Sequence, residues 1–236
     1  MRILIVTLLL LFEFPTLGFS HSRTFDGVDD TIAIADGASV RAQRPMAVGA
    51  WLKKDSASEQ DTILNKRGGT NDDWAMFSSA TSGIQLTFFG IADTSVTTPT
   101  WDTNWHYVVV TISSGGTVTF YSDGSSEGTA SINAPVTSTA TLHYMVAKDT
   151  SGTITAYQDG DVAHGQIWAR AISGVEVNET MWKPEFVPLN RSVLNPLFGV
   201  DSPEIDLSGN GKTGTLTGTT ESNEGPPVMF GDGLPL

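Results

Sequence analysis

The sequence predicts an all-β fold in which two antiparallel sheets pack face to face as a β-sandwich. Three observations support this prediction. Short segments rich in β-branched and aromatic residues recur along the chain, turns that contain glycine separate them, and long helical periodicity is missing. Many short strands at regular spacing with such turns are typical of a sandwich or barrel.

The strand predictions rest on alternation and on β-branched runs. Residues 31–34 and 47–52 alternate, whereas Trp105–Ile112 is nearly continuous, which indicates a central strand or burial on both faces. Further strands are expected at residues 84–89, 117–122, 142–147, 162–169 and 193–198. Ser114-Gly115-Gly116 lies between two alternating runs and predicts a hairpin.

One short helix is expected, over residues 173–180. Ser173 can cap its amino end, and Glu176 follows three residues later, which is the spacing of a capping box. No other segment of the chain shows an equally strong helical signal.

Composition narrows the classes of partner. The 236 residues include 26 acidic and 13 basic side chains, a formal net charge of -13, and we find no basic patch. Such a surface repels phosphate backbones, which disfavours nucleic acid as a partner. Acidic loops suit a hard cation such as calcium. Cysteine is absent, so packing of the core, with a metal as a further candidate, must stabilise the fold without disulfides.

The amino-terminal residues predict export. Arg2 precedes an apolar stretch, Ile3 to Phe12, which is too short to span a bilayer but fits a signal peptide. We place the signal peptide at residues 1–20 and a single mature domain at 21–236, with a tail rich in Gly and Pro at 225–236. The expected location is therefore extracellular or at the cell surface, and no later segment is long enough for a membrane span.

Six motifs follow one another in a characteristic order. They are Phe25-Asp26-Gly27-Val28-Asp29-Asp30, Val48-Gly49-Ala50-Trp51-Leu52-Lys53, Ile63-Leu64-Asn65-Lys66, Trp105-His106-Tyr107-Val108-Val109-Val110-Thr111, Phe120-Tyr121-Ser122-Asp123-Gly124, and Asp159-Gly160-Asp161 continuing through Ile167-Trp168-Ala169-Arg170-Ala171-Ile172-Ser173. Together they resemble the laminin G-like jelly-roll family of the concanavalin A-like superfamily. The resemblance implies a jelly-roll sandwich and a role in recognition.

The resemblance also contains a difference in order. Many relatives in this family carry an Asp-x-Ser-Gly-Asn-Gly loop before the Phe-Asp-Gly motif. Here Asp206-Leu207-Ser208-Gly209-Asn210-Gly211 follows that motif, near the carboxyl end. That order looks circularly shifted, which a fold with neighbouring termini tolerates. We expect residues 193–219 to complete the same sandwich beside the first strand.

The residues argue against catalysis. The superfamily includes glycoside hydrolases of the laminarinase type, which need two carboxylates flanking the sugar bond. Glu204-Ile205-Asp206 begins the alternating carboxylate pattern, but the second Glu is missing, and Asp206 is expected to serve a turn. The four histidines share no spacing that would bring them together as metal ligands.

The candidate binding residues lie in turns. Asp29, Asp30, Asp159 and Asp161 are the candidate calcium ligands, with local turn formation as the alternative. A second set of residues would contact a sugar if its members converge at one end of the sandwich: Asn71, Asp72, Asp73 and Trp101. Trp101 and Trp182 are expected to be exposed, whereas Trp51, Trp74, Trp105 and Trp168 are expected to be packed.

The function implied by the resemblance is a secreted, non-catalytic binding module. It would recognise extracellular carbohydrate or a glycoprotein, with calcium assisting. The alternative is a structural or adhesive subunit of a surface, filament or virion, which makes protein–protein contacts or assembles with itself. A glycoside hydrolase is the lesser alternative.

Overall fold

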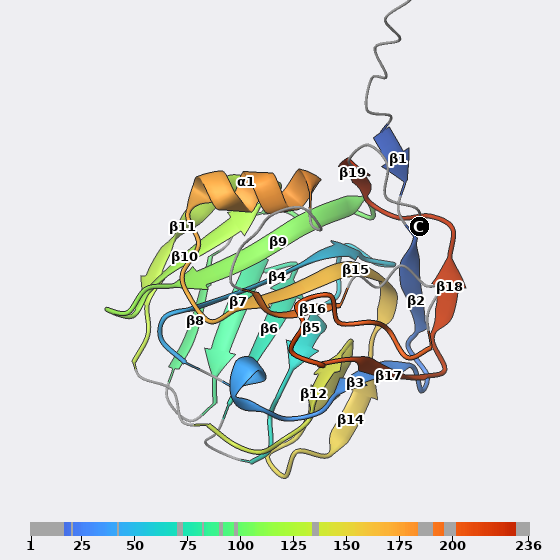
Figure 1. The fold of residues 1–236 in the computed structure, drawn as a ribbon, viewed down its shortest axis with the longest axis horizontal. Coiled ribbons are helices and arrows are strands. Elements are labelled where there is room, and N and C mark those ends of the chain that lie inside the picture. Colours follow the sequence, from blue (N-terminus) through green and yellow to red (C-terminus); the bar gives the residue numbers. More distant parts are fainter. Residues whose placement is uncertain are drawn as a thin grey trace, which may run out of the picture.

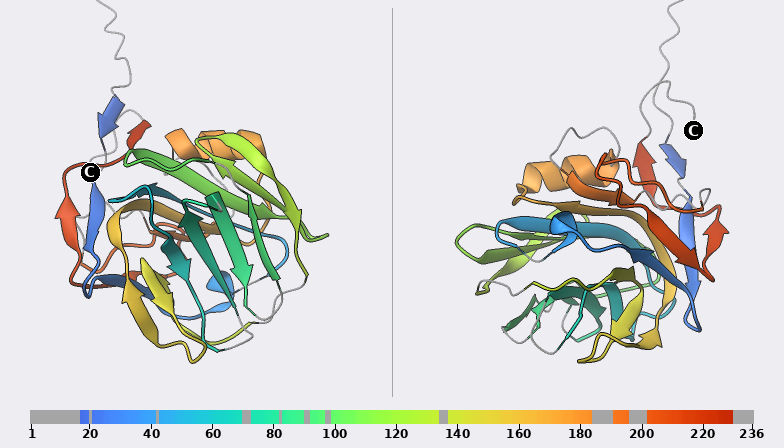
Figure 2. Two further views of the ribbon diagram at one scale, coloured as in Figure 1. Left: turned by 180° about the vertical axis from the view of Figure 1, so that it is seen from behind. Right: turned by 60° about the horizontal axis from the view of Figure 1, so that its bottom comes forward.

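The computed structural model describes residues 17–19, 21–41, 43–69, 73–81, 83–89, 92–96, 99–133, 137–183, 191–195 and 202–229. It confirms the predicted fold class, since two antiparallel sheets stack as the layers of a sandwich (Figures 1 and 2). Most of the predicted signal peptide, residues 1–16 and 20, lies outside the described residues, as do residues 230–236 of the predicted tail.

The larger sheet contains eight strands in the order β11-β10-β9-β4-β15-β2-β18, with β16 beside β15. Their bounds are β2 Ser22–Asp26, β4 Met46–Lys53, β9 Trp105–Ile112, β10 Thr117–Ser122, β11 Ser125–Ser131, β15 Asp159–Trp168, β16 Arg191–Asn195 and β18 Thr220–Ser222. Strands β9 and β10 form the predicted hairpin, in which Val118 pairs with Ile112.

The smaller sheet contains seven strands in the order β17-β3-β12-β5-β6-β7-β8. Their bounds are β3 Thr31–Ile34, β5 Asp61–Asn65, β6 Trp74–Ser79, β7 Gly83–Phe88, β8 Ala92–Val96, β12 Leu142–Tyr144 and β17 Gly214–Thr217. The remaining elements are β1 Leu17–Phe19 paired with β19 Pro227–Met229, β13 Val146–Lys148 paired with β14 Ile154–Tyr157, the 3-10 turn η1 Ala38–Val40, and the helix α1 Gly174–Trp182.

The predicted strand 142–147 is interrupted in the structure. Met145 has a positive φ of 55°, which an ordinary strand residue does not adopt. The chain therefore leaves the smaller sheet after β12 and continues as β13, which forms a separate hairpin with β14.

The main core lies between the two sheets and explains the alternation in the sequence. In β4, Val48, Ala50 and Leu52 are buried in this core. Ala47 and Trp51, at odd positions of the same strand, belong instead to a second buried cluster. The side chains of β9 also alternate between the main core and the second cluster. Its continuous apolar run therefore reflects burial on both faces, as the sequence indicated.

Helix α1 covers the outer face of the larger sheet (Figure 2, right). Val177 and Met181 pack in the second cluster with Trp51, Tyr107 and Trp168. The predicted capping box is present: the Ser173 backbone N–H donates to Glu176 Oε2 at 2.7 Å, and Ser173 Oγ accepts from the Glu176 backbone N–H. Among the described helices none is long and apolar enough to cross a membrane.

The carboxyl-terminal segment contributes strands to both sheets. Strand β16 pairs with β15 and β18 pairs with β2 in the larger sheet, while β17 pairs with β3 in the smaller one. Strand β1 lies within the predicted signal peptide, so cleavage after Ser20 would remove it and leave β19 without this partner.

Candidate functional site

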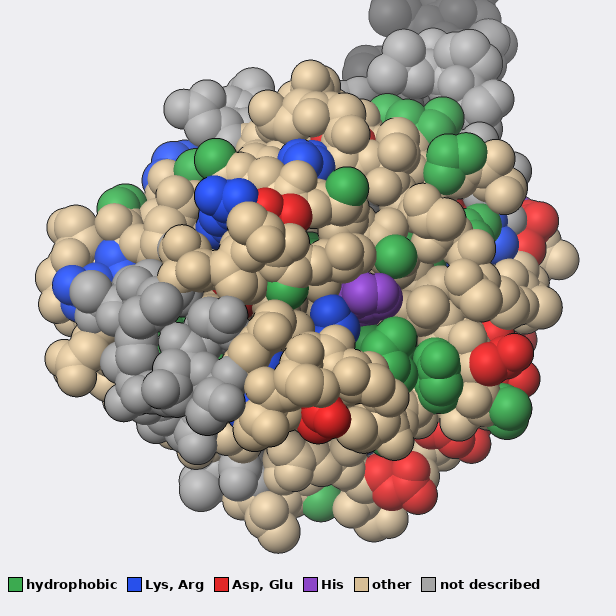
Figure 3. Space-filling model, turned by 90° about the horizontal axis from the view of Figure 1, so that it is seen from below, with side chains coloured by type: hydrophobic (Ala, Val, Ile, Leu, Met, Phe, Trp, Pro, Cys, Tyr) green, Lys and Arg blue, Asp and Glu red, His purple; other side chains and the backbone are tan. Residues whose placement is uncertain are grey.

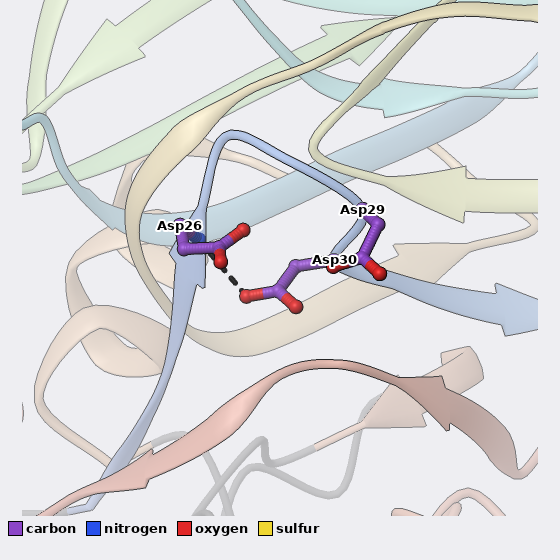
Figure 4. Close-up of side chains that lie close together, drawn as sticks. All are labelled: Asp26, Asp29 and Asp30. Atoms are coloured by element: carbon purple, nitrogen blue, oxygen red, sulfur yellow. Dashed lines mark hydrogen bonds between the residues drawn. The ribbon is translucent and has the colours of Figure 1, made fainter.

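Three carboxylates converge in the turn between β2 and β3. Asp26 is the last residue of β2, and Asp29 and Asp30 immediately precede β3 (Figure 4). One carboxylate oxygen of each residue lies within 4.8 Å of the others. The Asp26 backbone N–H donates to Asp30 Oδ2 at 2.9 Å, and the Val28 N–H donates to Asp26 Oδ1 at 2.8 Å. We call Asp26, Asp29 and Asp30 the carboxylate turn.

Within the carboxylate turn, Asp30 is buried beside two other acidic groups. Asp30 is only 4% exposed. Desolvation raises the pKa of its carboxyl group, and the charges of Asp26 and Asp29 raise it further, while the backbone hydrogen bond from Asp26 opposes this shift. A cation placed among these oxygens would offset the repulsion between the carboxylates and favour the ionised form of Asp30.

The carboxyl-terminal segment closes over the carboxylate turn. A Cβ added at Gly218, which has a φ of +73°, would collide with the Asp30 carboxylate and lie 3.3 Å from Asp29 Oδ1. The absence of a side chain therefore allows the backbone between β17 and β18 to approach the carboxylates closely. The segment between β17 and β18 therefore lies directly beside Asp29 and Asp30.

The four predicted calcium ligands do not form one group. Asp159 lies opposite Asp26 in the β15–β2 register but belongs to a second group, with Glu59 and Asp61. Lys54 Nζ lies 3.1 Å from Asp61 Oδ2, so a lysine side chain already neutralises part of the negative charge of that group.

Asp161 is also engaged elsewhere. It accepts a hydrogen bond from Thr24 Oγ1 at 2.5 Å and lies 3.8 Å from Lys53 Nζ. Sequence reasoning therefore placed Asp29 and Asp30 with each other but missed Asp26, whose position in the same six-residue motif was the available signal.

The predicted sugar-contact set is not supported where the structure describes it. Asp73 is 1% exposed and accepts a hydrogen bond from the buried ammonium of Lys66 at 2.8 Å. The expected exposure of Trp101 is wrong, because its ring is packed in the main core and Nε1 donates to the Gly83 carbonyl at 3.1 Å. Asn71 and Asp72 lie outside the described residues.

The remaining tryptophans largely follow the prediction. Trp51, Trp74 and Trp168 are buried, and Trp105 is partly buried against the second cluster. Trp182 is 37% exposed and lines a surface depression of about 420 Å³ together with Val175, Asn178, Glu179 and Lys183.

Glu204 and Asp206, which begin the alternating carboxylate pattern of a laminarinase-type enzyme, both have structural roles. Glu204 is buried, and its Oε1 accepts from Arg23 Nε at 2.5 Å. Asp206 accepts from the backbone N–H groups of Ser208 and Lys212 at 2.9 and 2.7 Å, which confirms its expected role in a turn. Both side chains therefore have structural partners within the carboxyl-terminal segment and β2.

His106 lies between two carboxylates. Its Nδ1 is 2.8 Å from Asp123 Oδ2 and its Nε2 is 3.0 Å from Asp102 Oδ1. The hydrogen bond with Asp123 is the main reason why the pKa of His106 is raised, while burial opposes the shift. The Trp101 ring meets the imidazole edge-on, with 5.6 Å between centroids.

We expect His106 to make stability depend on pH. Because the folded-state pKa is raised, the stabilisation is complete below the unfolded value of about 6.5 and is lost as pH rises through the folded pKa. His106→Gln should therefore lower the free energy of unfolding by about 1 kcal/mol at pH 5.5 and by less at pH 9, in denaturant titrations. An equal loss at both pH values would contradict this.

A polar pocket of about 400 Å³ opens where three loops meet at one end of the smaller sheet. We call it the basic pocket; it is lined by Arg67, Gly68, Ser138, Thr139, Ala140, Thr141, His143, Lys148, Ser151 and Gly152. Figure 3 shows the face viewed from below in Figure 1, on which basic side chains and a histidine lie near one another and carboxylates gather to one side. Sequence reasoning missed this pocket, because its residues come from separate segments.

The basic pocket and the depression at Trp182 differ from a hydrolase cleft. No carboxylate lines the basic pocket, and only Glu179 lines the depression. Neither therefore contains the two facing carboxylates that hydrolysis of a glycosidic bond requires.

Comparison with solved structures places the fold among several binding proteins. A candidate carbohydrate binding protein from Bacteroides ovatus is 14% identical, with a TM-score of 0.66 over 90% of this chain and 62% of that one, so this chain spans about six tenths of its length. A heptameric SAP-like pentraxin from Limulus polyphemus is 16% identical, with a TM-score of 0.55 over 68% and 81% of the two chains.

A third similar structure is the CBM40 module of a Ruminococcus gnavus IT-sialidase, bound to α2,3-sialyllactose. It is 12% identical, with a TM-score of 0.53 over 68% of this chain and 97% of that one. No curated protein sequence matches this chain significantly. The family profile described as the concanavalin A-like lectin/glucanases superfamily matches residues 26–178, which is most of the sandwich. The chain therefore belongs to the laminin G-like family of the concanavalin A-like lectin/glucanases superfamily.

Proposed function

We propose that this protein is a secreted, non-catalytic module that binds extracellular carbohydrate, with calcium bound at the carboxylate turn. The observation that carries the proposal is the basic pocket, a polar hollow of about 400 Å³ without a lining carboxylate. Ligand pockets of roughly this volume hold small molecules, and hydroxyl-bearing side chains can hydrogen-bond a sugar.

Similar proteins support the same proposal. The Bacteroides ovatus protein shares the fold over 90% of this chain, and the sialidase module with bound sialyllactose shares it over 68%. At identities of 14% and 12% these likenesses concern the fold. The site on this chain is therefore argued from its own residues.

Calcium is the cation that suits the carboxylate turn. Asp26, Asp29 and Asp30 offer hard oxygen donors, and the Gly218 backbone lies beside them. No lysine or arginine forms an ion pair with these three carboxylates among the described residues, in contrast to the group around Asp61. A bound calcium would tie the β2–β3 turn to the segment between β17 and β18, and so stabilise the sandwich edge.

The calcium proposal predicts a change in the melting temperature. At a calcium concentration one hundred times the Kd, binding stabilises a protein by about 2.7 kcal/mol. For a chain of this size, that corresponds to a rise of about 5–10 °C. We expect calcium to produce such a rise and Asp30→Asn to abolish it, while the variant melts no lower than the wild type in chelator, because one repulsive charge is gone.

A matched variant controls for the change in net charge. Glu179→Gln removes one negative charge from the exposed face of α1 and should leave the calcium response unchanged. An equal calcium response in wild type and Asp30→Asn would reject the carboxylate turn as the calcium site.

The carbohydrate proposal is tested with a glycan array probed with the purified protein. Binding to a defined group of glycans supports a carbohydrate-binding module. Oligomers or filaments without any glycan binding would instead support the structural or adhesive alternative, and release of reducing sugar from β-glucans would overturn the non-catalytic assignment.

A further inference from the structure

The two cations of the basic pocket are among the described basic side chains that form no ion pair within 4.0 Å. Six described basic side chains form ion pairs with carboxylates within 4.0 Å: Arg23, Arg41, Lys53, Lys54, Lys66 and Arg170. Arg67 and Lys148 form no such pair with any described residue. In a protein with a formal net charge of -13, two cations that line one pocket without a carboxylate within 4.0 Å favour an anionic ligand.

Lys148 is held in the wall of the pocket with little access to water. Its side chain is 8% exposed, and Nζ donates to the Thr141 carbonyl at 2.7 Å. Desolvation, followed by the charge of Lys66, lowers the pKa of Lys148 to about 8, while Asp73 opposes the shift. A bound anion would relieve this cost, because it would add a second negative charge to the opposing effect of Asp73.

Arg67 is oriented by contacts that leave part of its guanidinium available. Nε donates to the Gly69 carbonyl at 3.0 Å and Nη1 donates to the Lys148 carbonyl at 3.4 Å. The guanidinium carbon lies 4.2 Å from the centre of the Phe89 ring. Within the described part of the protein no hydrogen bond engages Nη2, which can therefore donate to a ligand.

The other groups of the pocket are neutral hydrogen-bonding groups. Burial and the charge of Lys148 lower the pKa of His143 to about 4, so its imidazole is neutral at pH 7. Its Nδ1 donates to the Thr141 carbonyl at 3.2 Å, which leaves Nε2 as an acceptor for a hydroxyl group. Nearby Asp149 accepts hydrogen bonds from the Ser151 and Thr153 N–H groups of its own turn. Its pKa is lowered mainly by the Ser151 hydrogen bonds and also by the charge of Arg67, which lies beyond ion-pair distance.

We infer that the basic pocket binds an acidic sugar residue, whose carboxylate lies between Arg67 and Lys148 and whose hydroxyls contact the neutral lining residues. This inference rests on the proposed carbohydrate function and specifies its ligand class. Nη2 of Arg67 can donate a charge-assisted hydrogen bond to the carboxylate, and the Lys148 ammonium supplies a second charge. A neutral sugar would leave both cations unpaired, so the same pocket would reject it.

Isothermal titration of the purified protein with matched ligands tests this inference. The acidic probes are a galacturonic acid oligosaccharide and α2,3-sialyllactose, and the neutral controls are a galactose oligosaccharide and lactose. We expect at least one acidic probe to bind roughly tenfold or more tightly than its neutral counterpart, with an affinity that falls as salt is added. Its affinity should also fall between pH 7 and pH 9.5, as Lys148 loses its proton.

Variants assign the binding to the pocket. Arg67→Gln and Lys148→Met should each weaken binding of the acidic probe by roughly tenfold or more, because charged hydrogen bonds are lost. Lys183→Gln, which removes an exposed charge at the end of α1, is the matched control and should change the affinity less than about twofold. If Lys148→Met does not fold, Arg67→Gln still decides the outcome.

The possible failures are distinguishable. Binding of neutral glycans only, or acidic binding that both variants leave unchanged, would overturn the pocket assignment while the carbohydrate function stands. No binding of any glycan would overturn the proposed function as well. Sodium sulfate that binds as tightly as the acidic sugars and shows the same variant dependence would show that the pocket recognises charge without the sugar.

Discussion

Replacing Lys66 with methionine is expected to lower the free energy of unfolding by about 3–5 kcal/mol. The Lys66 side chain is fully buried, and its ammonium lies 2.8 Å from Asp73 Oδ2 and 2.9 Å from Asp36 Oδ1. The Asp73 side chain is also fully buried, so the substitution leaves a carboxylate without its cation in a region that water does not reach. Urea titration measures the loss.

A double-mutant cycle separates two free energies. One is the cost of leaving the Asp73 carboxylate buried without Lys66, and the other is the net stabilisation by the ion pair. Lys66→Met combined with Asp73→Asn removes both charges, and asparagine tolerates the positive φ of 57° at this position. We expect the double variant to recover part of the loss, because replacing both partners of a buried pair is far less costly than removing one. A double variant as unstable as the sum of the single variants would show that the two residues act independently.

The ion pair of Lys66 and Asp73 also positions one wall of the basic pocket. Asp73 Oδ2 accepts from the backbone N–H and hydroxyl of Ser138, and Lys66 Nζ donates to the Ser138 carbonyl at 3.1 Å. Ser138 lies in the segment that forms one wall of the pocket. Asp73, which was expected to contact a sugar, therefore holds a residue that does face the pocket.

The fold could be predicted because its signals are local. Alternation in β4 and the continuous run in β9 follow directly from one or two buried faces, and the capping box of α1 lies within four consecutive residues. The carboxylate turn was found in part for the same reason, since its three members lie within five residues.

The environment of single side chains could not be predicted in this way. Asp73 follows two polar residues and resembles an exposed loop, but its partner Lys66 lies across the β5–β6 connection. Trp101 follows Pro99 in a threonine-rich stretch, yet its indole reaches a carbonyl eighteen residues away. The basic pocket combines segments near residues 67, 140 and 150, and no local pattern indicates that such segments meet.

Substituting Gly165 with alanine is expected to cost about 3 kcal/mol, through overpacking against Tyr144. A Cβ at Gly165 would collide with the Tyr144 hydroxyl and lie 2.7 Å from Cζ and 2.9 Å from Cε1. The Tyr144 ring is fully buried, so it has no space into which it can move. The expected result is a lower midpoint in urea with an unchanged m-value.

Tyr144→Phe provides the matched control and a second, opposite prediction. The Tyr144 hydroxyl is buried and has no hydrogen-bond partner in the described part of the protein, and burial raises its pKa. Removing it should leave stability unchanged or increase it, because an unsatisfied polar group costs free energy when it is buried. Because the hydroxyl is the atom closest to the added Cβ, Gly165→Ala should cost less in the Tyr144→Phe background than in the wild type. An equal cost in both backgrounds would place the strain in the β15 backbone, where the register shifts between Ala163 and Gln166, instead of in the contact with the ring.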